Sequence, residues 1–407
     1  MRIVFLVDWF SEKMGYAENC MPKALASLGH EVHVVTSTAQ VYSTEKFYPQ
    51  VYEPYLGPPF VEPEVRPLDG FTLHRLPLDR RKKGGLHIAG LRRKLFDLRP
   101  EVVQTYDVLG PTTVTAAWAK PFLGYQLFTG NHMVASVFPL YHSYAAKPWN
   151  FRLGYWLGTT LKGAALHAFV AKCYPATVDA AEIAVRFWGV PRRKMRIDIL
   201  GVDTDLFRPP ASPADGESRR ELRRKLGAGD DELLCVYTGR FTDGKNPLRL
   251  AQAIALLRKG GRPFRAVFLG SGPQEKEILA CEGCSVHPFV AFRDLPPFFR
   301  AADIGAWPQQ ESTSMLDAAA CGLPIVVSSR VQAVERVDGN GLRYEEGSTE
   351  DLARALRELE AKDLRLRFGA CGARKAESIS WLSLARRRAE DYEASRGTAR
   401  VGNGERP

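Results

Sequence analysis

The chain has 407 residues, too many for one ordinary core, and its 45% hydrophobic and 25% charged residues are typical of a globular protein. The formal net charge of +10 favours anionic partners, such as phosphorylated small molecules, anionic lipid headgroups or nucleic acid. No apolar run reaches the roughly 18 residues of a membrane span. The N-terminal segment is expected to be a buried strand, not a signal peptide. Seven scattered cysteines favour a reducing, cytoplasmic location over a disulfide framework.

The first half of the chain alternates short apolar runs with amphipathic stretches, as parallel strands joined by helices do. Residues 37–70 show no period but are rich in aromatic side chains, which predicts a lid or an acceptor-facing loop. Residues 208–219 are rich in Pro, Ser, Ala and charge, which predicts an interdomain linker. We expect strands at 2–8, 30–36, 71–77, 102–105, 125–129, 167–171 and 196–200, and helices at 17–28, 90–98, 111–120, 149–161 and 176–188.

The second half restarts the same alternation, so we predict an α/β protein with two doubly wound, Rossmann-like domains that face a cleft. The expected domains are 1–208 and 209–380, followed by a helix at 381–396 that packs back toward the first domain and a loose tail at 397–407. Strands are expected at 233–238, 265–269, 285–289, 304–307, 324–328 and 341–344, and helices at 248–259, 273–280, 349–361, 364–376 and 381–395.

The stretch from Trp307 to Gly322 combines the end of an apolar strand, a polar turn and a helix. Ser312, Thr313 and Ser314 offer caps for that helix, which should end at Gly322. Free backbone N–H groups at such a helix start can hold an anion. An ordinary αβ connection with a polar turn would show the same pattern.

Neighbouring strand ends favour the anion site. Arg240 and Lys245 lie five residues apart just past the predicted strand 233–238, where Arg can grip phosphate oxygens with two nitrogens and Lys adds a point charge. Gly270 and Gly272 follow the adjacent strand, and glycine lets a backbone approach a ligand closely. Together these turns predict a nucleotide-diphosphate site. His132 stands on a loop after another strand, at the edge where open α/β sheets place ligands.

Several motifs resemble those of the retaining glycosyltransferases of family 4 (glycosyl transferases group 1), which have the GT-B fold of two Rossmann-like domains. The resemblance covers nearly the whole chain, and its motifs occur in the family's order and spacing. They are Gly29-His30-Glu31-Val32, Gly201-Val202-Asp203-Thr204-Asp205-Leu206-Phe207, Gly239-Arg240 with Lys245-Asn246-Pro247, Gly270-Ser271-Gly272-Pro273, and Asp317-Ala318-Ala319-Ala320-Cys321-Gly322-Leu323-Pro324.

The resemblance implies transfer of a sugar from a nucleotide-sugar donor with retention at the anomeric carbon. Arg240 and Lys245 match the pair that holds the donor diphosphate and steadies the leaving phosphate. His132 matches the histidine that contacts the donor sugar near the reacting carbon. Gly15 matches the glycine of the first loop, whose backbone lies against the donor phosphate.

The chain departs from the family pattern at the two glutamates of the C-terminal motif, which are Gln309 and Asp317 here. Asp317 can still accept hydrogen bonds from ribose hydroxyls, and Gln309 can bond a sugar hydroxyl without a charge. Glu311 offers a carboxylate two residues on from Gln309. Ser312 stands where the family often has glycine.

The resemblance implies no metal and no cofactor other than the nucleotide-sugar substrate, because members of the family neutralise the leaving diphosphate with Arg, Lys and a helix N-terminus. Asp203-Thr204-Asp205 has the spelling of a metal motif but lies in the linker block, where capping contacts explain it better. Cys281 and Cys284 have zinc-like spacing, but no second pair completes a four-ligand site.

Two functions of different classes remain. The first is a retaining glycosyltransferase with a glycan, lipid-linked or cell-envelope acceptor, peripheral at the inner face of an anionic membrane through the basic clusters 80–83 and 92–94. The second is a nucleotide-sugar-binding protein with weak or lost turnover, suggested by Gln309 and Asp317. A nucleic-acid binder is a more distant third, because the basic residues form no stripe interleaved with aromatic ones.

Overall fold

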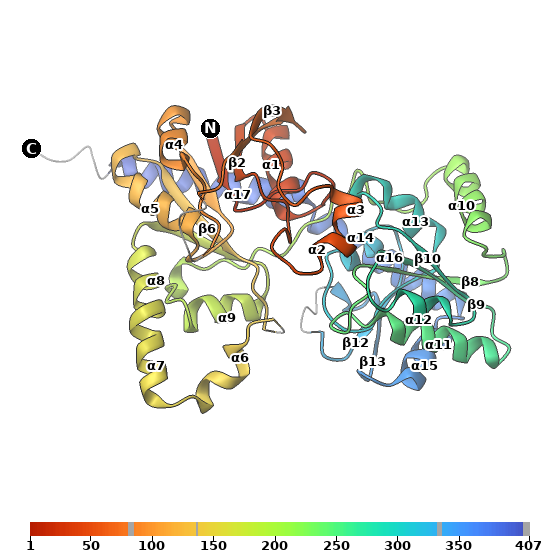
Figure 1. Cartoon of the computed structure of the whole chain (residues 1–407). Helices are drawn as coiled ribbons and strands as arrows, with labels where there is room; N and C mark the ends of the chain where they lie inside the picture. The colour runs from red at the N-terminus through yellow and green to blue at the C-terminus, as the bar shows by residue number, and fades with distance from the viewer. Residues whose placement is uncertain (80–84, 136, 332–335, 402–407) are drawn as a thin grey trace, which may run out of the picture.

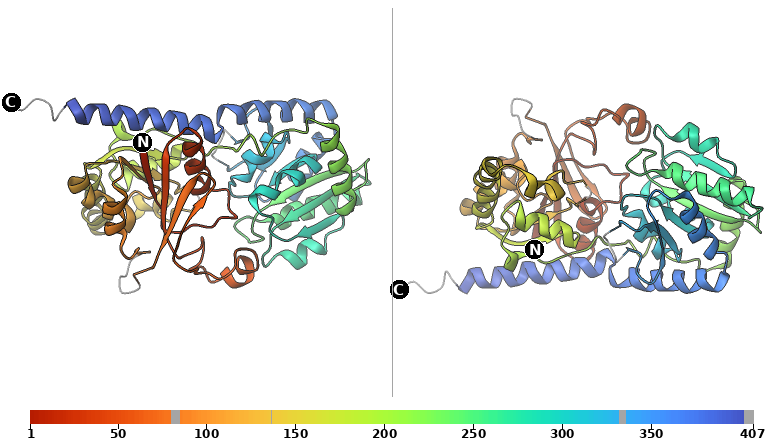
Figure 2. Two further views of the ribbon diagram at one scale, coloured as in Figure 1. Left: turned by 90° about the horizontal axis from the view of Figure 1, so that it is seen from above. Right: turned by 90° about the horizontal axis from the view of Figure 1, so that it is seen from below.

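The computed structural model describes residues 1–79, 85–135, 137–331 and 336–401, so the basic cluster at 80–83 lies outside the described residues (Figure 1). The chain forms two α/β domains side by side, each built on one sheet with helices around it (Figures 1 and 2). The two doubly wound domains predicted from the alternating pattern are therefore confirmed.

The N-terminal domain contains a seven-stranded sheet in the order β3-β4-β2-β1-β5-β6-β7. Of the strand pairs in the described part of this sheet, β3 and β4 are antiparallel and the others are parallel. The strands are β1 (Arg2–Leu6), β2 (Glu31–Ser37), β3 (Glu64–Leu68), β4 (Phe71–Leu76), β5 (Val102–Thr105), β6 (Gln126–Asn131) and β7 (Val170–Pro175). The helices are α1 (Ala17–Ser27), α2 (Tyr48–Val51), α3 (Glu53–Leu56), α4 (Leu91–Leu98), α5 (Pro111–Leu123), α6 (Leu140–Ser143), α7 (Trp149–Tyr155), α8 (Leu161–Leu166) and α9 (Val178–Arg186).

The C-terminal domain contains a six-stranded parallel sheet in the order β10-β9-β8-β11-β12-β13, so the chain reverses direction across the sheet between β8 and β11. Ligands of open parallel sheets bind at such a reversal. The strands are β8 (Leu233–Thr238), β9 (Phe264–Leu269), β10 (Cys284–His287), β11 (Ile304–Trp307), β12 (Ile325–Ser328) and β13 (Gly341–Tyr344). The helices are α10 (Pro213–Lys225), α11 (Pro247–Lys259), α12 (Glu275–Leu279), α13 (Pro296–Ala301), α14 (Ser314–Ala320), α15 (Thr349–Glu358) and α16 (Lys362–Ser378).

The last helix, α17 (Trp381–Val401), leaves the C-terminal domain and packs along the N-terminal one (Figure 2). Its buried apolar side chains join the core around β1 and α1. Arg388 on this helix is buried, donates to Asp198 Oδ2 over 2.7 Å and lies over the ring of Tyr174. The ion pair and the ring contact therefore tie the crossing helix to the N-terminal domain. Although α17 has 21 residues, neither it nor any other helix in the described ranges is long and apolar enough to cross a membrane.

The two chain crossings between the domains run side by side. Val202 and Ser380 form a parallel bridge, and Trp381 N donates to Val202 O over 3.0 Å. A Cβ on Gly201 would lie 2.7 Å from the ring of Trp381, so only glycine fits there. Asp203 accepts a hydrogen bond from Leu206 N over 3.3 Å, which is the capping role expected for the linker block.

Four expectations about local structure are wrong. Residues 37–70 contain α2, α3 and β3. The expected linker 208–219 includes the start of α10, because Ser212 and Asp215 form a capping box. Residues 196–200 run beside β7 without forming a strand, although Arg196 N and Asp198 N donate hydrogen bonds to Cys173 O and Pro175 O of β7. Helix α17 continues through Val401, into the stretch expected to be a loose tail.

Candidate active site

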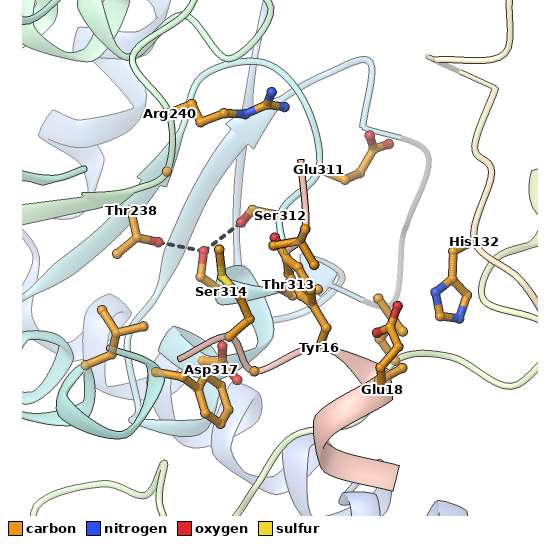
Figure 3. A pocket seen from close by; sticks show the side chains of 18 of the residues that line it. Tyr16, Glu18, His132, Thr238, Arg240, Glu311, Ser312, Thr313, Ser314 and Asp317 are labelled. Atoms are coloured by element: carbon orange, nitrogen blue, oxygen red, sulfur yellow. Dashed lines mark hydrogen bonds between the residues drawn. The ribbon is translucent and has the colours of Figure 1, made fainter. Parts of the chain in front are cut away.

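The strand, turn and helix at the centre of the C-terminal domain are β11, a polar turn and α14 (Figure 3). Thr313 is the N-cap of α14, but its side chain makes no capping hydrogen bond. Thr238 Oγ1 instead donates to Ser314 Oγ over 2.6 Å, and Ser314 Oγ lies 2.7 Å from Ser312 Oγ. The expected capping role of these residues is therefore wrong. Their hydroxyls link the turn to the end of β8 by hydrogen bonds, because Thr238 is the last residue of that neighbouring strand.

Arg240 and Lys245 follow β8 and line a cleft between the domains, as do Ser312, Thr313 and Ser314. Lys245 Nζ donates to the main-chain oxygen of Glu311 over 2.6 Å, so it is held against the turn before α14. Burial, together with the charge of Arg240, lowers the pKa of Lys245 to about 8. The structure thus brings the two predicted diphosphate ligands to one wall.

Gly270 and Gly272, predicted to approach the donor, do not line the cleft in the described structure. A Cβ on Gly270 would lie 1.9 Å from Gly239 O, and one on Gly272 would lie 2.6 Å from Phe241 O. Both glycines have φ of +151°. They let the loops after β8 and β9 pack backbone to backbone. This packing fixes the main chain on both sides of Arg240.

The structure separates the two residues that replace the family's glutamates. Asp317 lines the cleft on α14 and is 5% exposed. Its pKa is raised well above the ordinary value, because burial disfavours the charged form and Asp203 adds a like charge. Gln309 is half-buried and is not among the lining residues, whereas Glu311 is.

The opposite wall comes from the N-terminal domain, from the loop before α1 and the end of β6. Gly15 lies at the contact between the domains, since a Cβ there would overlap the ring of Phe292 at 2.0 Å. His132 lies beside Tyr106, with 5.3 Å between ring centres. Burial lowers the pKa of His132 to about 4, and Arg388 adds to the effect. His132 is therefore a neutral hydrogen-bonding group at neutral pH.

Sequence reasoning missed Glu18, which lines the cleft from the first turn of α1 near His132 (Figure 3). Burial raises the pKa of this carboxyl to about 7, so it gains and loses a proton near neutrality. Perturbed carboxyls in a cleft are candidates for acid or base chemistry. The available signal was an acidic residue three positions after Gly15, at the start of a predicted helix.

Residues 41–56 form an aromatic segment that joins the two walls. The guanidinium carbon of Arg240 lies 5.4 Å from the ring centres of both Tyr42 and Phe47. Tyr42 and Tyr16 share a hydrogen bond between their hydroxyls, 3.1 Å long. Tyr52 stacks on Phe289 of the C-terminal domain with 5.7 Å between ring centres. The segment therefore packs over Arg240, in the region expected to form a lid or acceptor-facing loop.

Among the described residues, no group of three or more His, Cys, Asp or Glu side chains is placed to hold a metal ion. Cys281 and Cys284 are both present as free thiols. His287 lies nearby in sequence, but its Nδ1 is 2.9 Å from Pro288 O.

Family models match both domains of the chain. The model described as "Glycosyl transferase 4-like domain" matches residues 21–201, and the model described as "Glycosyl transferases group 1" matches residues 232–362. Together they span most of the chain, in the order in which the two domains occur. The chain belongs to the group 1, family 4 glycosyltransferases. The resemblance inferred from the motifs is confirmed.

The similar proteins include the D-inositol 3-phosphate glycosyltransferase of Xylanimonas cellulosilytica, which is 34% identical over 218 residues. That alignment covers 49% of this chain and 51% of the relative, so the chain spans about half the length of the curated relatives it matches. The Anabaena protein HepE, solved in complex with UDP, superposes with a TM-score of 0.70 at 16% identity over 97% of this chain and all of HepE. A glycosyltransferase of Rickettsia africae superposes with a TM-score of 0.68 at 14% identity, over 97% of this chain and 98% of its own. These superpositions establish the GT-B fold.

Proposed function

We propose that this member of the family transfers a sugar from a nucleotide-diphosphate-sugar, with retention at the anomeric carbon, to a glycan, lipid-linked or cell-envelope acceptor. The observation that carries the proposal is the pairing of two walls. Arg240 and Lys245 line one wall of the cleft, and His132 and Glu18 line the other.

The C-terminal wall suits the leaving group. Cleavage of the bond between sugar and phosphate adds negative charge to the diphosphate, and fixed cations stabilise that charge in the transition state. Arg240 supplies a permanent charge, and Lys245 supplies one below a pH of about 8. Burial raises the pKa of Asp317, which favours the protonated form, and a protonated carboxyl can both donate to and accept from a ribose hydroxyl. We propose that the donor needs no metal and the enzyme no further cofactor.

The N-terminal wall suits the sugar and the acceptor. His132, neutral at physiological pH, can bond a donor sugar hydroxyl without repelling an oxocarbenium-like centre, which a protonated imidazole would do. Glu18 can orient the acceptor hydroxyl and take up its proton, because its pKa of about 7 leaves a large share in the carboxylate form.

We also propose that the protein works in the cytoplasm at the inner face of a membrane, with the basic helix α4 near anionic headgroups. Arg92 and Arg93 on this helix are exposed. Exposed cations next to an anionic leaflet contribute favourable electrostatic energy.

A thermal-shift screen against UDP-, GDP- and ADP-sugars tests the donor site, because a ligand that binds only the folded state raises the melting temperature. Turnover is then measured with the active donor and a panel of acceptors that includes D-inositol 3-phosphate, the acceptor named for the relatives. The anomeric configuration of the product, read by NMR, tests retention. No shift with any nucleotide-sugar would reject the proposal.

A nucleotide-sugar-binding protein with weak or lost turnover is the alternative, because Gln309 carries no charge and does not line the cleft. Donor binding without transfer or donor hydrolysis, across the whole acceptor panel, would favour it. Arg240→Ala and Lys245→Ala should lower the donor shift under either function, whereas only the transferase has a turnover for them to reduce.

A further inference from the structure

Exposed apolar side chains cover the end of the N-terminal domain that lies farthest from the C-terminal domain. Figures 1 and 2 place α5 and the helical stretch from α7 to α8 together at this end. On α5, Val114, Trp118 and Phe122 are spaced four residues apart and so share one side of the helix. Trp118 is 69% exposed and Phe122 is 77% exposed.

A second stripe runs along the neighbouring helical stretch. α7, the π-helical turn η2 (Trp156–Thr160) and α8 follow one another without a break in helical backbone angles. No residue from Trp149 to Lys162, a fully described range, is buried. The exposed apolar residues of the stripe have helical spacing and are Trp149, Leu153, Trp156, Leu157 and Leu161.

The two stripes lie on helical segments at the same end of the N-terminal domain and are together called the distal apolar face. Lys120 Nζ on α5 donates to the main-chain oxygen of Phe169, just after α8, over 2.6 Å. Phe169 is itself 43% exposed. Exposed apolar side chains gathered at one end of a domain are typical of a binding site for a protein or a membrane.

The charge pattern of the same segment is one-sided. From Val108 to Val178 the sequence contains five Lys or Arg residues and no Asp or Glu. Lys147, Arg152 and Lys162 flank the stripe along the helical stretch. α4 packs beside α5 and adds the exposed Arg92 and Arg93.

We propose that the distal apolar face docks the protein on an anionic lipid bilayer, with the helical stretch 149–166 lying in the headgroup region. Helices that lie in a membrane interface combine Trp, Phe and Leu on one side with Lys and Arg at the border. Tryptophan favours the depth where apolar chains meet headgroups. This docking rests on the membrane location proposed above and gives it a surface separate from the cleft.

A bilayer fits the face better than a protein partner does. Interfaces between proteins are depleted in Lys at their core, and they carry paired charges of both signs. Here the cations border the apolar stripe and no acidic residue of the segment accompanies them. A uniformly anionic surface satisfies all of them at once, in any rotation about the membrane normal.

Flotation with lipid vesicles tests the proposal on the full chain. Vesicles of phosphatidylcholine alone are compared with vesicles that also contain phosphatidylglycerol, at low and at high salt. We expect strong binding only to the anionic vesicles, weakened by salt because the Debye length shortens.

Two pairs of variants separate the apolar from the ionic part. Leu153→Ser with Leu157→Ser should lower binding at least about tenfold, because inserted side chains supply the apolar part of the affinity. The matched control is Leu279→Ser with Leu366→Ser, two exposed leucines of the C-terminal domain. Arg152→Gln with Lys162→Gln should lower binding to anionic vesicles by roughly fivefold for each charge removed. Lys259→Gln with Lys362→Gln, both exposed, is the matched control.

Each outcome bears on the proposal. Loss of vesicle binding in the two face variants, with binding kept in both controls, supports it. Absence of binding to anionic vesicles, or equal loss in the controls, overturns it. If sedimentation shows a dimer that Leu153→Ser with Leu157→Ser dissociates, the face is an interface between copies and docking is likewise overturned. Vesicle binding needs no donor, so a failed nucleotide-sugar screen in the same samples would reject the proposed function alone.

Discussion

The two walls of the cleft carry charge in different ways. The C-terminal wall presents Arg240 and Lys245, and the hydroxyls beside them are fixed to one another by short hydrogen bonds. The N-terminal wall presents His132 and Glu18, whose pKa values burial moves to about 4 and about 7. One wall therefore suits an anion, and the other suits neutral hydroxyl groups and the exchange of a proton. The proposed transfer from a diphosphate donor requires both.

The largest expected effect comes from removing the permanent cation. Arg240→Ala should lower kcat/KM by about 10²–10³, the usual cost of losing one preorganised group that stabilises transition-state charge. Steady-state kinetics with the donor found in the screen would measure it. Arg374→Ala, at an exposed position on α16, is the control. If Arg240→Ala retains most of its activity, the C-terminal wall does not act through fixed charge.

The N-terminal wall should affect the pH dependence of the free energy of unfolding, even in the absence of substrate. The folded-state pKa of Glu18 is raised from 4.5 to about 7, so folding favours the protonated form. Stability is therefore lost as pH rises from about 4.5 to about 7, and the loss persists above that range. Glu18→Gln should be more stable than the wild type at pH 8, by about 1–3 kcal/mol after allowance for partial exposure, and little different at pH 4.

Chemical denaturation at both pH values measures this difference. Glu62→Gln, which changes an exposed carboxyl on the same domain, should show no such dependence. A Glu18→Gln protein that is less stable at pH 8 would contradict the burial of this carboxylate. Once turnover can be measured, kcat/KM of the wild type should rise with pH near neutrality, and Glu18→Gln should lack this rise.

The two cations of the C-terminal wall also differ from each other, because the charge of Lys245 depends on pH and the charge of Arg240 does not. Its pKa is lowered to about 8, so it is charged below that pH and neutral above it. Affinity for a nucleoside diphosphate should therefore fall by about tenfold between pH 7 and pH 9, as one close charge is lost. Calorimetric titration would measure the fall. Lys245→Arg should flatten it, and an equally steep fall in that variant would assign the pH dependence to another group.

The C-terminal wall could be predicted further from sequence than the N-terminal wall. Arg240, Lys245 and the turn at 312–314 follow strand ends of one sheet, and parallel strands bring their carboxyl ends to one edge. The fold could also be predicted, from the alternation of apolar runs with amphipathic stretches along the chain. Glu18 does not follow a strand end, and its raised pKa depends on burial in the folded protein, which local pattern does not encode. Gly270 and Gly272 fit the ligand pattern equally well, but backbone packing explains their presence.

Segments with competing signals were the hardest to predict. The first residues of α10 are Pro, Ser and charge, which indicate a loop by composition. The helix is held from outside, because Arg219 and Arg223 both pair with Asp303 over 2.6 and 2.8 Å. The aromatic segment 41–56 likewise has no period of its own, since its rings pack on Arg240 and Phe289 from the other domain. Tertiary contacts of this kind override local propensity.

The smallest expected effect tests whether the aromatic segment helps to hold the donor cation. Phe47→Leu keeps the apolar contact but removes one of the two rings 5.4 Å from the guanidinium of Arg240. A cation–π contact contributes about 0.5–1 kcal/mol at a partly exposed site, so donor affinity should fall about two- to fivefold. Phe60→Leu, four residues beyond the end of this segment, serves as the control and should leave affinity unchanged. An increase in affinity in Phe47→Leu would mean that the rings compete with the donor for Arg240, and that the segment shields the site from its ligand. In either case the change should vanish in an Arg240→Ala background, because both effects act through that one side chain.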